Sequence, residues 1–552
     1  MHLRILLGGC LVTASAVSGE PVANRFRPSE DVARSKAPQI FNAIHNSMRQ
    51  WGSSLQHNGM SFFLATVPQG VLFHHGNNSP LSPSEPEWLA YEIEHAEGFA
   101  RGRMGGLGRG PGNILRRGPH GRSMYPSGVV DEEEEEEEHG YLHVYRTTRP
   151  MKYIYVDGMG AGKTSMGTLD SQDMILRGKK TCLNNTEQGL RMRHQDEDKP
   201  PSRPPGGGGP MDERQRAADL CELAQEWSLD GIIRMEAGFE IIHCDFSDGL
   251  EQVQALQRPT DSAAAPGRRG SGGLEHLRGL AERYQGIGSS RTTIDYSSMV
   301  SAFFFPANLT NPDPKRQDLP RLCSAGQDEL AKIKGFLKKT ISEKKDQQFR
   351  TVDWQDVTDI IVARYADRLK FMAEETHSLE VMASEVNFLT TVFIDSQDRE
   401  DQVNNAVERC TSFYLGSVSL ITESDAYVKA ALDTTMRKIC KVLFEVRDLV
   451  ATNPSPDQKS LESSVSAVKD LTEYLNWTRF KRCPPCAIDE VCLIPMWPFG
   501  TVQQYNSPRC SNGTDVNGEE NYWGHGPGGR PGGEPPMGGN GQQPLFVSDS
   551  EL

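Results

Sequence analysis

The sequence contains no long hydrophobic run and no internal repeat. Hydrophobic residues make up 37% of its 552 positions. Beyond the N-terminus, no stretch approaches the roughly 18–20 apolar residues that a membrane helix needs. A multi-span membrane protein is therefore excluded. A fully disordered chain is excluded as well, because apolar residues recur in patterned segments that can form cores.

A complete catalytic motif is also missing. No HExxH motif occurs, and Gly158–Thr164, which looks like a phosphate-binding loop, has Asp157 where the pattern requires its first glycine. A carboxylate at that position would repel phosphate, so we interpret the segment as a glycine-rich turn after a strand. Two alternatives stay open: a nucleoside triphosphate site, and a loop for another ligand that uses Asp157 and Lys163.

Glycine and proline are plentiful but unevenly spread. The chain has 53 glycines and 34 prolines, and their excess over average usage lies in three inserts and a C-terminal tail. The formal charge of −15 is local too, because the run Asp131–Glu138 supplies eight acidic residues beside a Gly/Arg-rich stretch. Such segments cannot build a core. We therefore expect disordered loops at about 101–140, 193–215 and 258–274, and a disordered tail at 513–552.

The N-terminus is typical of a secretory signal peptide. Arg4 precedes a short apolar stretch, and Ala14-Ser15-Ala16 offers a small-residue cleavage site. We expect residues 1–19 to be removed and the mature protein to be secreted, extracellular and without a transmembrane segment. The alternatives are a lipoprotein anchored at Cys10 and an ordinary buried N-terminal segment.

Ten cysteines remain once Cys10 leaves with the signal peptide, an even number that suits disulfides in an oxidising compartment. The close pair Cys483 and Cys486 leaves a redox site or a zinc site open as alternatives. The disulfide candidates are Cys182, Cys221, Cys244, Cys323, Cys410, Cys440, Cys483, Cys486, Cys492 and Cys510.

Five sequons for N-glycosylation add to the case for secretion. They begin at Asn77, Asn184, Asn308, Asn476 and Asn512. Together with the signal peptide and the cysteines, they predict a disulfide-stabilised glycoprotein.

The segments between the inserts predict a mixed first half and a helical second half. We expect an interrupted α+β N-terminal domain at 20–306, a mainly α-helical bundle at 320–480 and a small cysteine-rich C-terminal cap at 481–512. In the first half the patterns indicate two strands around a turn within 60–75, a helix at 86–100, strands at Tyr141–Tyr145, Tyr153–Val156 and Phe239–Phe246, and a helix at 213–228.

In the second half, apolar residues at three- and four-residue steps predict five amphipathic helices. Asp353 is placed to cap the helix that begins with Trp354. We expect the apolar faces to form the core of one bundle. Cys323, Cys410 and Cys440 lie in or beside these stripes, where each could join two helices.

A second group of polar residues has the types that suit zinc. These are His74, His75, Glu92, Glu94 and His95. Adjacent residues of a strand point to opposite faces, so His74 and His75 cannot both join a site with the residues that follow. We assign no metal site.

The segment Val71–Gly76 resembles the strand that carries the His-Gly pair in the ADP-ribosyltransferase superfamily, and the order of elements after it is similar. The resemblance implies that His75 holds the nicotinamide-side ribose of NAD and that the backbone of Gly76 meets the nicotinamide amide. Trp88 or Tyr91 would supply an aromatic wall.

The same resemblance implies a catalytic glutamate on a late strand, for which Glu240 is the candidate. Asn77 departs from the family, which has threonine or serine there. NAD is expected as a cofactor only under this interpretation.

A broader resemblance links four stretches to a family of large secreted proteins from filamentous fungi that has no assigned function. The stretches are Ala43–Gly52, Glu92–Ala96, Tyr155–Gly158 and Thr168–Asp173. The resemblance implies secretion and a shared architecture, and nothing about a reaction. Because no complete catalytic motif occurs and large charged segments are expected to be disordered, we expect a non-enzymatic extracellular or surface interaction protein with an unidentified extracellular partner and no nucleic acid. The alternative is an ADP-ribosyltransferase-like NAD-binding protein or enzyme.

Overall fold

The computed structural model describes only part of the chain. The described residues are 26–49, 57–100, 139–179, 182, 213–236, 238–259, 291–345, 351–398, 401–478, 481, 483–495, 497, 500–512 and 522–523. The expected signal peptide, nearly all of the three expected loops and almost all of the expected tail lie outside these residues. None of the described helices combines the length and apolarity needed to cross a bilayer.

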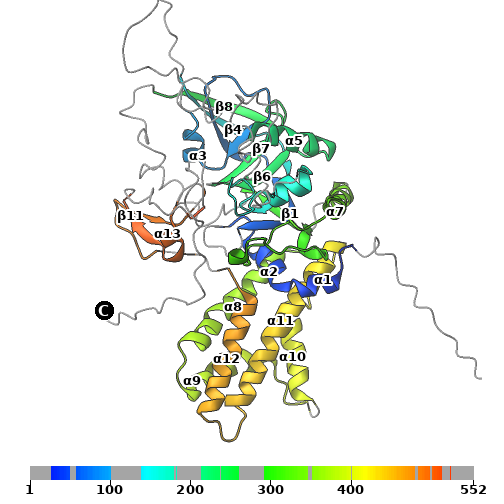
Figure 1. Cartoon of the computed structure of the whole chain (residues 1–552), viewed down its shortest axis with the longest axis vertical. Coiled ribbons are helices and arrows are strands. Elements are labelled where there is room, and N and C mark those ends of the chain that lie inside the picture. The colour runs from blue at the N-terminus through cyan, green and yellow to red at the C-terminus, as the bar shows by residue number, and fades with distance from the viewer. Residues whose placement is uncertain are drawn as a thin grey trace, which may run out of the picture.

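A nine-stranded sheet forms one half of the molecule (Figure 1), with the strand order β8-β4-β2-β3-β7-β6-β5-β1-β9. Neighbouring strands are antiparallel, except that β5 and β6 run parallel. The strands are β1 (Asn58–Val67), β2 (Leu72–Asn77), β3 (Glu87–Ala90), β4 (Tyr141–Thr147), β5 (Met151–Gly158), β6 (Gly231–Met235), β7 (Phe239–His243), β8 (Leu250–Gln257) and β9 (Thr293–Ser301).

Burial differs sharply between the middle of the sheet and its β8 edge. Every residue of β6 and β7 is buried, whereas most of β8 is exposed. The middle strands are covered on both faces, which explains apolar pairs such as Ile232-Ile233 in place of a strict alternation. At the edge, glutamine and glutamate side chains of β8 face water and discourage pairing with another chain.

The second half of the molecule is a helical bundle beneath the sheet (Figure 1). Its helices are α8 (Trp354–Glu374), α9 (Leu379–Thr390), α10 (Gln402–Ser412), α11 (Glu423–Val450) and α12 (Gln458–Leu475). The predicted cap of α8 is confirmed, because the side chain of Asp353 accepts a hydrogen bond from the amide of Asp356. Thr422 and Asp425 form a reciprocal capping box at the start of α11.

Buried residues of the bundle and of the sheet belong to one hydrophobic core. Helix α7 (Gln327–Lys345) belongs to the expected bundle by sequence but packs against β9 and the π-helical turn η2 (Ser171–Leu176). Conversely, α1 (Glu30–Ser35) and α2 (Ala37–Asn46) come from the N-terminal segment and pack on α11. An apolar stripe shows that a helix face is buried but does not select its partner.

The two strands expected around a turn within 60–75 are confirmed as β1 and β2, which pair with other strands and not with each other, since β1 lies between β5 and β9 while β2 lies between β3 and β4. One local prediction in the first half is wrong. The helix expected at 86–100 is the strand β3 followed by the short helix α3 (Ile93–Glu97). Pairing of β3 with β7 satisfies its backbone and overrides the local helical pattern.

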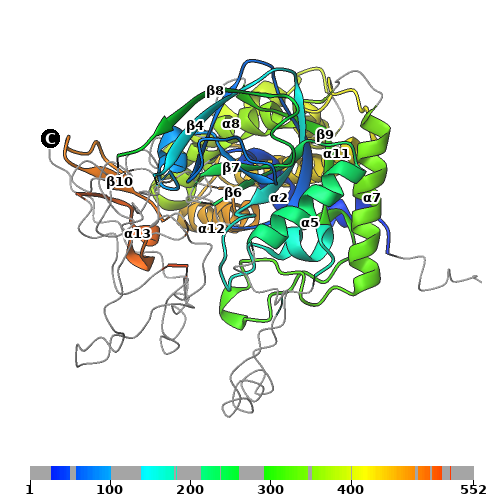
Figure 2. The same cartoon turned by 90° about the horizontal axis from the view of Figure 1, so that it is seen from above.

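The cysteine-rich segment packs beside the sheet as a small cap (Figure 2). It contains β10 (Val491–Leu493), β11 (Arg509–Ser511) and α13 (Val502–Asn506), and β10 pairs with β11. The ring of Tyr522 stacks on that of Tyr505 and makes an edge-to-face contact with the ring of His57, which immediately precedes β1. The cap therefore covers the end of the sheet where β1 begins and β5 ends. Helix α5 (Glu213–Glu226) packs on β6 and β7.

Candidate functional site

The end of β5 carries a buried carboxylate held in a distorted stretch of β1. Pairing between β1 and β5 is irregular from Asn58 to Phe62, and within this bulge the amide of Ser61 donates to Asp157 Oδ1 at 2.9 Å. A Cβ at Gly59 would lie 1.9 Å from the carbonyl oxygen of Asp157 and 2.1 Å from its Oδ1. Only glycine therefore lets β1 close around this carboxylate, and bulges of this kind often aim a functional side chain.

Burial is the largest influence on the pKa of the Asp157 carboxylate. It raises the pKa of Asp157 from its ordinary value of 3.8 to about 7, against the hydrogen bonds from Ser61 and Met60 that favour the charged form. Near neutral pH the side chain thus lies at the balance between its two protonation states.

This shift predicts a specific pH dependence of stability. In the absence of added metal ions, the folded protein holds a proton on Asp157 between about pH 4 and 7 that the unfolded chain releases, so stability falls as pH rises through this window. The loss amounts to about 4 kcal/mol for roughly 3 pKa units. Asp157→Asn keeps an acceptor for Ser61 but cannot ionise. Urea unfolding in EDTA should show the wild type losing stability relative to this variant from pH 4 to 7, and parallel curves would contradict the assignment.

The phosphate-loop motif is a turn whose backbone amides are already used. The amide of Ala161 donates to the Met235 carbonyl at 2.9 Å, and that of Gly162 donates to the Met159 carbonyl at 3.0 Å. Lys163 Nζ lies 2.8 Å from Glu236 Oε1 and 4.9 Å from the centroid of the Trp497 ring. The segment is a glycine-rich turn after a strand, as the sequence predicts, and its lysine serves an internal ion network.

That network continues across β6 and β7. Arg234 is completely buried and donates from Nε to Glu240 Oε1 at 2.8 Å, while its other side binds Glu213 at the start of α5. Burial alone would raise the pKa of Glu240, but Arg234 and His95 outweigh it and hold that pKa below its usual range. These side chains neutralise one another inside the protein.

The residues implied by the ADP-ribosyltransferase resemblance do not converge. His74, Ala90 and Glu240 are directly opposite one another across β2, β3 and β7, so His74 and Glu240 share a face of the sheet. His75, the next residue of β2, therefore lies on the opposite face. Glu240 reaches Arg234 and His95 instead.

The other members of this set are occupied by packing. His75 Nδ1 bonds the carbonyl oxygen of Trp88 at 2.8 Å, and burial lowers the pKa of His75 to about 4. A Cβ at Gly76 would lie 2.1 Å from the Ala96 carbonyl, so α3 covers this backbone. Tyr91 is buried, with its hydroxyl 2.6 Å from Thr292 Oγ1. No NAD site is assembled from these residues.

The candidate zinc residues do not form a cluster of three ligand atoms among the described residues. Burial lowers the pKa of His74, and the nearby charges of Glu92 and Glu94 oppose that shift. Glu92 pairs with Arg291 at 2.7 Å, and His95 lies 3.8 Å from Glu240. Among the described residues, three side chains of metal-ligand type have their ligand atoms within 4.8 Å of one another in only two places. These are Cys483, Cys486 and Cys510, and Asp170 with Cys182 and Cys323. All of these cysteines form disulfides.

Every one of the ten candidate cysteines is in a disulfide. The pairs are Cys182–Cys323, Cys221–Cys244, Cys410–Cys440, Cys483–Cys492 and Cys486–Cys510. The CxxC pair is not joined to itself, and each of its cysteines bonds a partner farther along the chain. Of the three cysteines expected to join helices, Cys410 and Cys440 join α10 to α11, whereas Cys323 bonds Cys182 in the first half.

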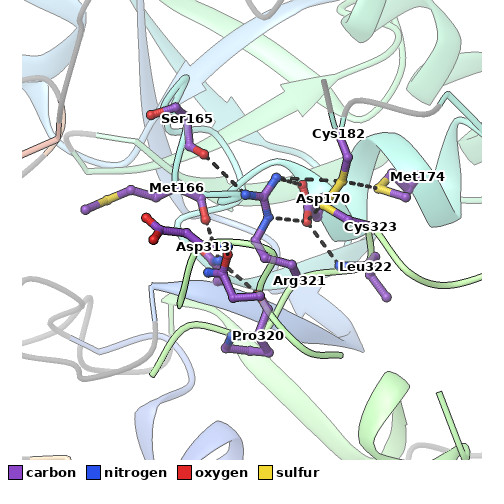
Figure 3. Close-up of a disulfide and its surroundings, with 12 residues drawn as sticks. Ser165, Met166, Asp170, Met174, Cys182, Asp313, Pro320, Arg321, Leu322 and Cys323 are labelled. Carbon is purple, nitrogen blue, oxygen red and sulfur yellow. Dashed lines mark hydrogen bonds and ion pairs between the residues drawn. A yellow bond between two sulfur atoms is a disulfide. The ribbon is translucent and has the colours of Figure 1, made fainter. Parts of the chain in front are cut away.

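The surroundings of Cys182–Cys323 are charged (Figure 3). Arg321 donates from Nε to Asp170 Oδ2 at 2.7 Å. Its Nη1 donates to the carbonyl oxygen of Ser165. Asp170 also accepts from the amide of Leu322 at 3.1 Å. The ion pair and the disulfide together fix the chain before α7 to the turns that follow β5.

The sequon asparagines differ in exposure. Asn308, Asn476 and Asn512 are exposed and Asn77 is half-buried, while Asn184 lies outside the described residues.

Sequence reasoning missed Arg234, Glu213 and Asn58, which organise this end of the sheet. An arginine inside an apolar strand, as in Gly231–Met235, is the one signal that could have indicated a buried ion pair.

Comparisons with known proteins support an uncharacterised fungal family. Residues 25–141 and 127–265 match the family model described as the YPL277C N-terminal domain. The chain is 26% identical to the uncharacterised protein YOR389W of Saccharomyces cerevisiae, over 86% of this chain and 84% of that protein. It is 34% identical to the uncharacterised yeast protein YPL277C, over 41% of this chain and 44% of that protein. No solved structure matches. The resemblance to ADP-ribosyltransferases is not shown by these matches.

Proposed function

We propose that this chain is a secreted, disulfide-stabilised glycoprotein that acts as a non-enzymatic extracellular or surface interaction protein. The observation that carries the proposal is the pairing of all ten candidate cysteines in five disulfides. Disulfides of this number persist in secreted proteins and are rare where glutathione keeps thiols reduced.

Two further features support secretion. The N-terminal segment has the charge, apolar stretch and small residues of a signal peptide. Three sequon asparagines, Asn308, Asn476 and Asn512, are exposed, as attachment of a glycan requires.

The state of the polar side chains supports a binding role over catalysis. The lysine of the phosphate-loop motif is paired with Glu236, and the candidate glutamate Glu240 is paired with Arg234. A catalytic acid or base needs access to a substrate proton, which these internal pairs do not offer.

Exposed apolar side chains on the bundle support an interaction role. Phe388 and Val392 near the end of α9 are 56% and 69% exposed, and Phe413 after α10 is 63% exposed. The Arg368 guanidinium lies 4.2 Å from the centroid of the Phe388 ring. Groups of exposed apolar side chains beside charged ones are common where proteins contact partners.

Secretion of the full chain from a fungal host tests the proposal. We expect the protein in the medium, with a mobility that shifts on endoglycosidase treatment and with only trace free thiol among the ten cysteines by non-reducing and reducing mass mapping. A chain that lacks residues 1–19 is the control and should stay inside the cells. Retention of the full chain in the cells with several free cysteines would contradict the proposal.

The same secreted protein separates the interaction role from the enzymatic alternative. Incubated with labelled NAD, it should neither hydrolyse the dinucleotide nor transfer ADP-ribose. Turnover that disappears in both His75→Ala and Glu240→Gln would instead establish the NAD-dependent alternative.

A further inference from the structure

The four cysteines of the cap lie close enough to exchange partners. In the structure Cys483 bonds Cys492 and Cys486 bonds Cys510. The Sγ atoms of Cys483, Cys486 and Cys510 nevertheless all lie within 4.8 Å of one another. Cys483 therefore has the sulfur of Cys486 as a neighbour in addition to that of its own partner. Among the described residues, three cysteine sulfurs gather this closely only here.

Strand pairing brings the remaining combination of cysteines together. Cys492 of β10 and Cys510 of β11 are directly opposite each other in the antiparallel ladder. Opposite residues of such a ladder have Cα atoms about 4.5–5.5 Å apart, and disulfides form across Cα separations of about 4.4–6.8 Å. The fold thus supports a second complete pairing, Cys483 with Cys486 and Cys492 with Cys510, in which the two strands keep their positions.

These sulfurs are within reach of a thiol in the surrounding solution. All four cysteines are only half-buried, and Pro484 and Pro485 between the first two are exposed. The carbonyl oxygen of Pro484 lies 3.7 Å from Cys486 Sγ and 3.6 Å from Cys510 Sγ. The loop between the two cysteines of the CxxC pair is therefore folded against the bond that it would replace.

The disulfide Cys182–Cys323 provides a contrast, because its cysteines are half-buried as well. The third ligand-type atom beside its sulfurs is a carboxylate oxygen of Asp170. A carboxylate cannot form a disulfide, and its charge repels an approaching thiolate. If this bond opened, each sulfur would have only its original partner nearby among the described residues.

We propose that the cap is a thiol–disulfide exchange site, at which an external thiol converts the first pairing into the second. The external thiolate attacks Cys510 Sγ, which forms a mixed disulfide and releases Cys486 as a thiolate. Cys486 attacks the neighbouring Cys483 Sγ, so that the Cys483–Cys486 bond forms and Cys492 leaves as a thiolate. Cys492 attacks the mixed disulfide at the opposite Cys510, which closes the second bond and returns the external thiolate. No net oxidation or reduction occurs.

The exchange changes what holds the cap to the rest of the chain. In the first pairing, the loop from Cys483 to Cys486 is bonded to both strands of the cap. In the second, β10 and β11 are bonded to each other and the loop is bonded only to itself. Because this loop lies between α12 and β10 in the chain, the exchange loosens the strands from the segment that follows the bundle. The inference goes beyond the proposed interaction role and does not depend on it.

Trapping a released sulfur in the full chain tests the proposal. In Cys510→Ser, Cys486 loses its partner beside Cys483 and should displace Cys492 within hours at about pH 8. Alkylation with N-ethylmaleimide and disulfide mapping by mass spectrometry then locate the one free thiol. We expect the label to divide between Cys486 and Cys492, with at least about a tenth of it on Cys492 and a matching amount of the Cys483–Cys486 bond.

The matched control is Cys221→Ser, which frees the half-buried Cys244 at a place without a third cysteine sulfur among the described residues. There the label should stay on Cys244 alone.

The wild type gives an arm that needs no substitution. With catalytic amounts of reduced glutathione, it should gain the Cys483–Cys486 and Cys492–Cys510 bonds in equal amounts, while the other three disulfides keep their partners. Label confined to Cys486 in Cys510→Ser, or a wild type that keeps its original pairing, would overturn the proposal.

Discussion

Arg234→Met should destabilise the protein by about 3–5 kcal/mol, the range for breaking a buried ion pair from one side. Arg234 has no exposed surface and contacts Glu240, Glu213 and, through Nη1 at 3.1 Å, Gln172. Removing its guanidinium takes from Glu240 its arginine partner and from Glu213 one of three cationic partners, the others being Arg216 and Lys163. Urea unfolding at pH 7 measures the loss.

The matched control is Arg146→Met. Arg146 pairs with Glu251 at 2.5 Å, but both side chains are about half exposed, so the loss should stay within about 1 kcal/mol. Adding Glu240→Gln to Arg234→Met should recover part of the stability, because it removes a buried charge that has lost its arginine partner. Equal losses of stability in Arg234→Met and Arg146→Met would show that pairing of buried charges does not hold the network together. A further loss when Glu240→Gln is added to Arg234→Met would show the same.

Removing the Cys182–Cys323 disulfide should be the most costly loss of a disulfide in the chain. This bond joins residues 141 positions apart, and Cys483–Cys492 joins residues 9 apart. Loop-closure entropy gives about 5 kcal/mol for the longer loop and about 2.5 kcal/mol for the shorter one. The paired alanine variants of each disulfide should therefore differ by roughly twofold in urea unfolding.

The environment of the longer disulfide adds a second readout. Arg321 and Asp170 beside it form an ion pair at 2.7 Å that survives in the alanine variant. Arg321→Met in that background should then cost more than in the wild type, because the disulfide no longer helps to hold this chain to the turns after β5. Two results would contradict this role of the Cys182–Cys323 disulfide. One is an equal loss of unfolding free energy for the long and the short disulfide, and the other is a double variant whose loss equals the sum of the losses from removing the disulfide and from Arg321→Met.

Several features of the fold could be predicted from short-range patterns alone. The steps of apolar residues from Trp354 to Met372 and from Val428 to Val446 correctly located α8 and α11, because a helix repeats within the span of a few residues. Asp353 was recognisable as a cap for the same reason. The even number of cysteines indicated complete pairing before any pair was known, and the pattern of a strand followed by a glycine-rich turn at 153–164 was correct.

The candidate site was less accessible to this reasoning. Asp157 and Lys163 stand out in the sequence as one motif, yet the structure directs the first to the β1 bulge and the second to Glu236. Asn58 carries no local signal, since its role comes from carbonyls 108 and 262 positions away. His75 and Glu240 looked like one site, and only strand register places them on opposite faces.

By itself, then, the sequence determined the periodic and capped elements, the interruption of the first half by charged and glycine-rich inserts, and the cysteine count. Tertiary structure decided which cysteines pair, that α7 packs on the sheet while α1 and α2 join the bundle, and which carboxylates are buried with a cation and which without. The physical reason is range: helical and strand periods arise from neighbours along the chain, whereas register, partner choice and burial depend on contacts between segments hundreds of residues apart.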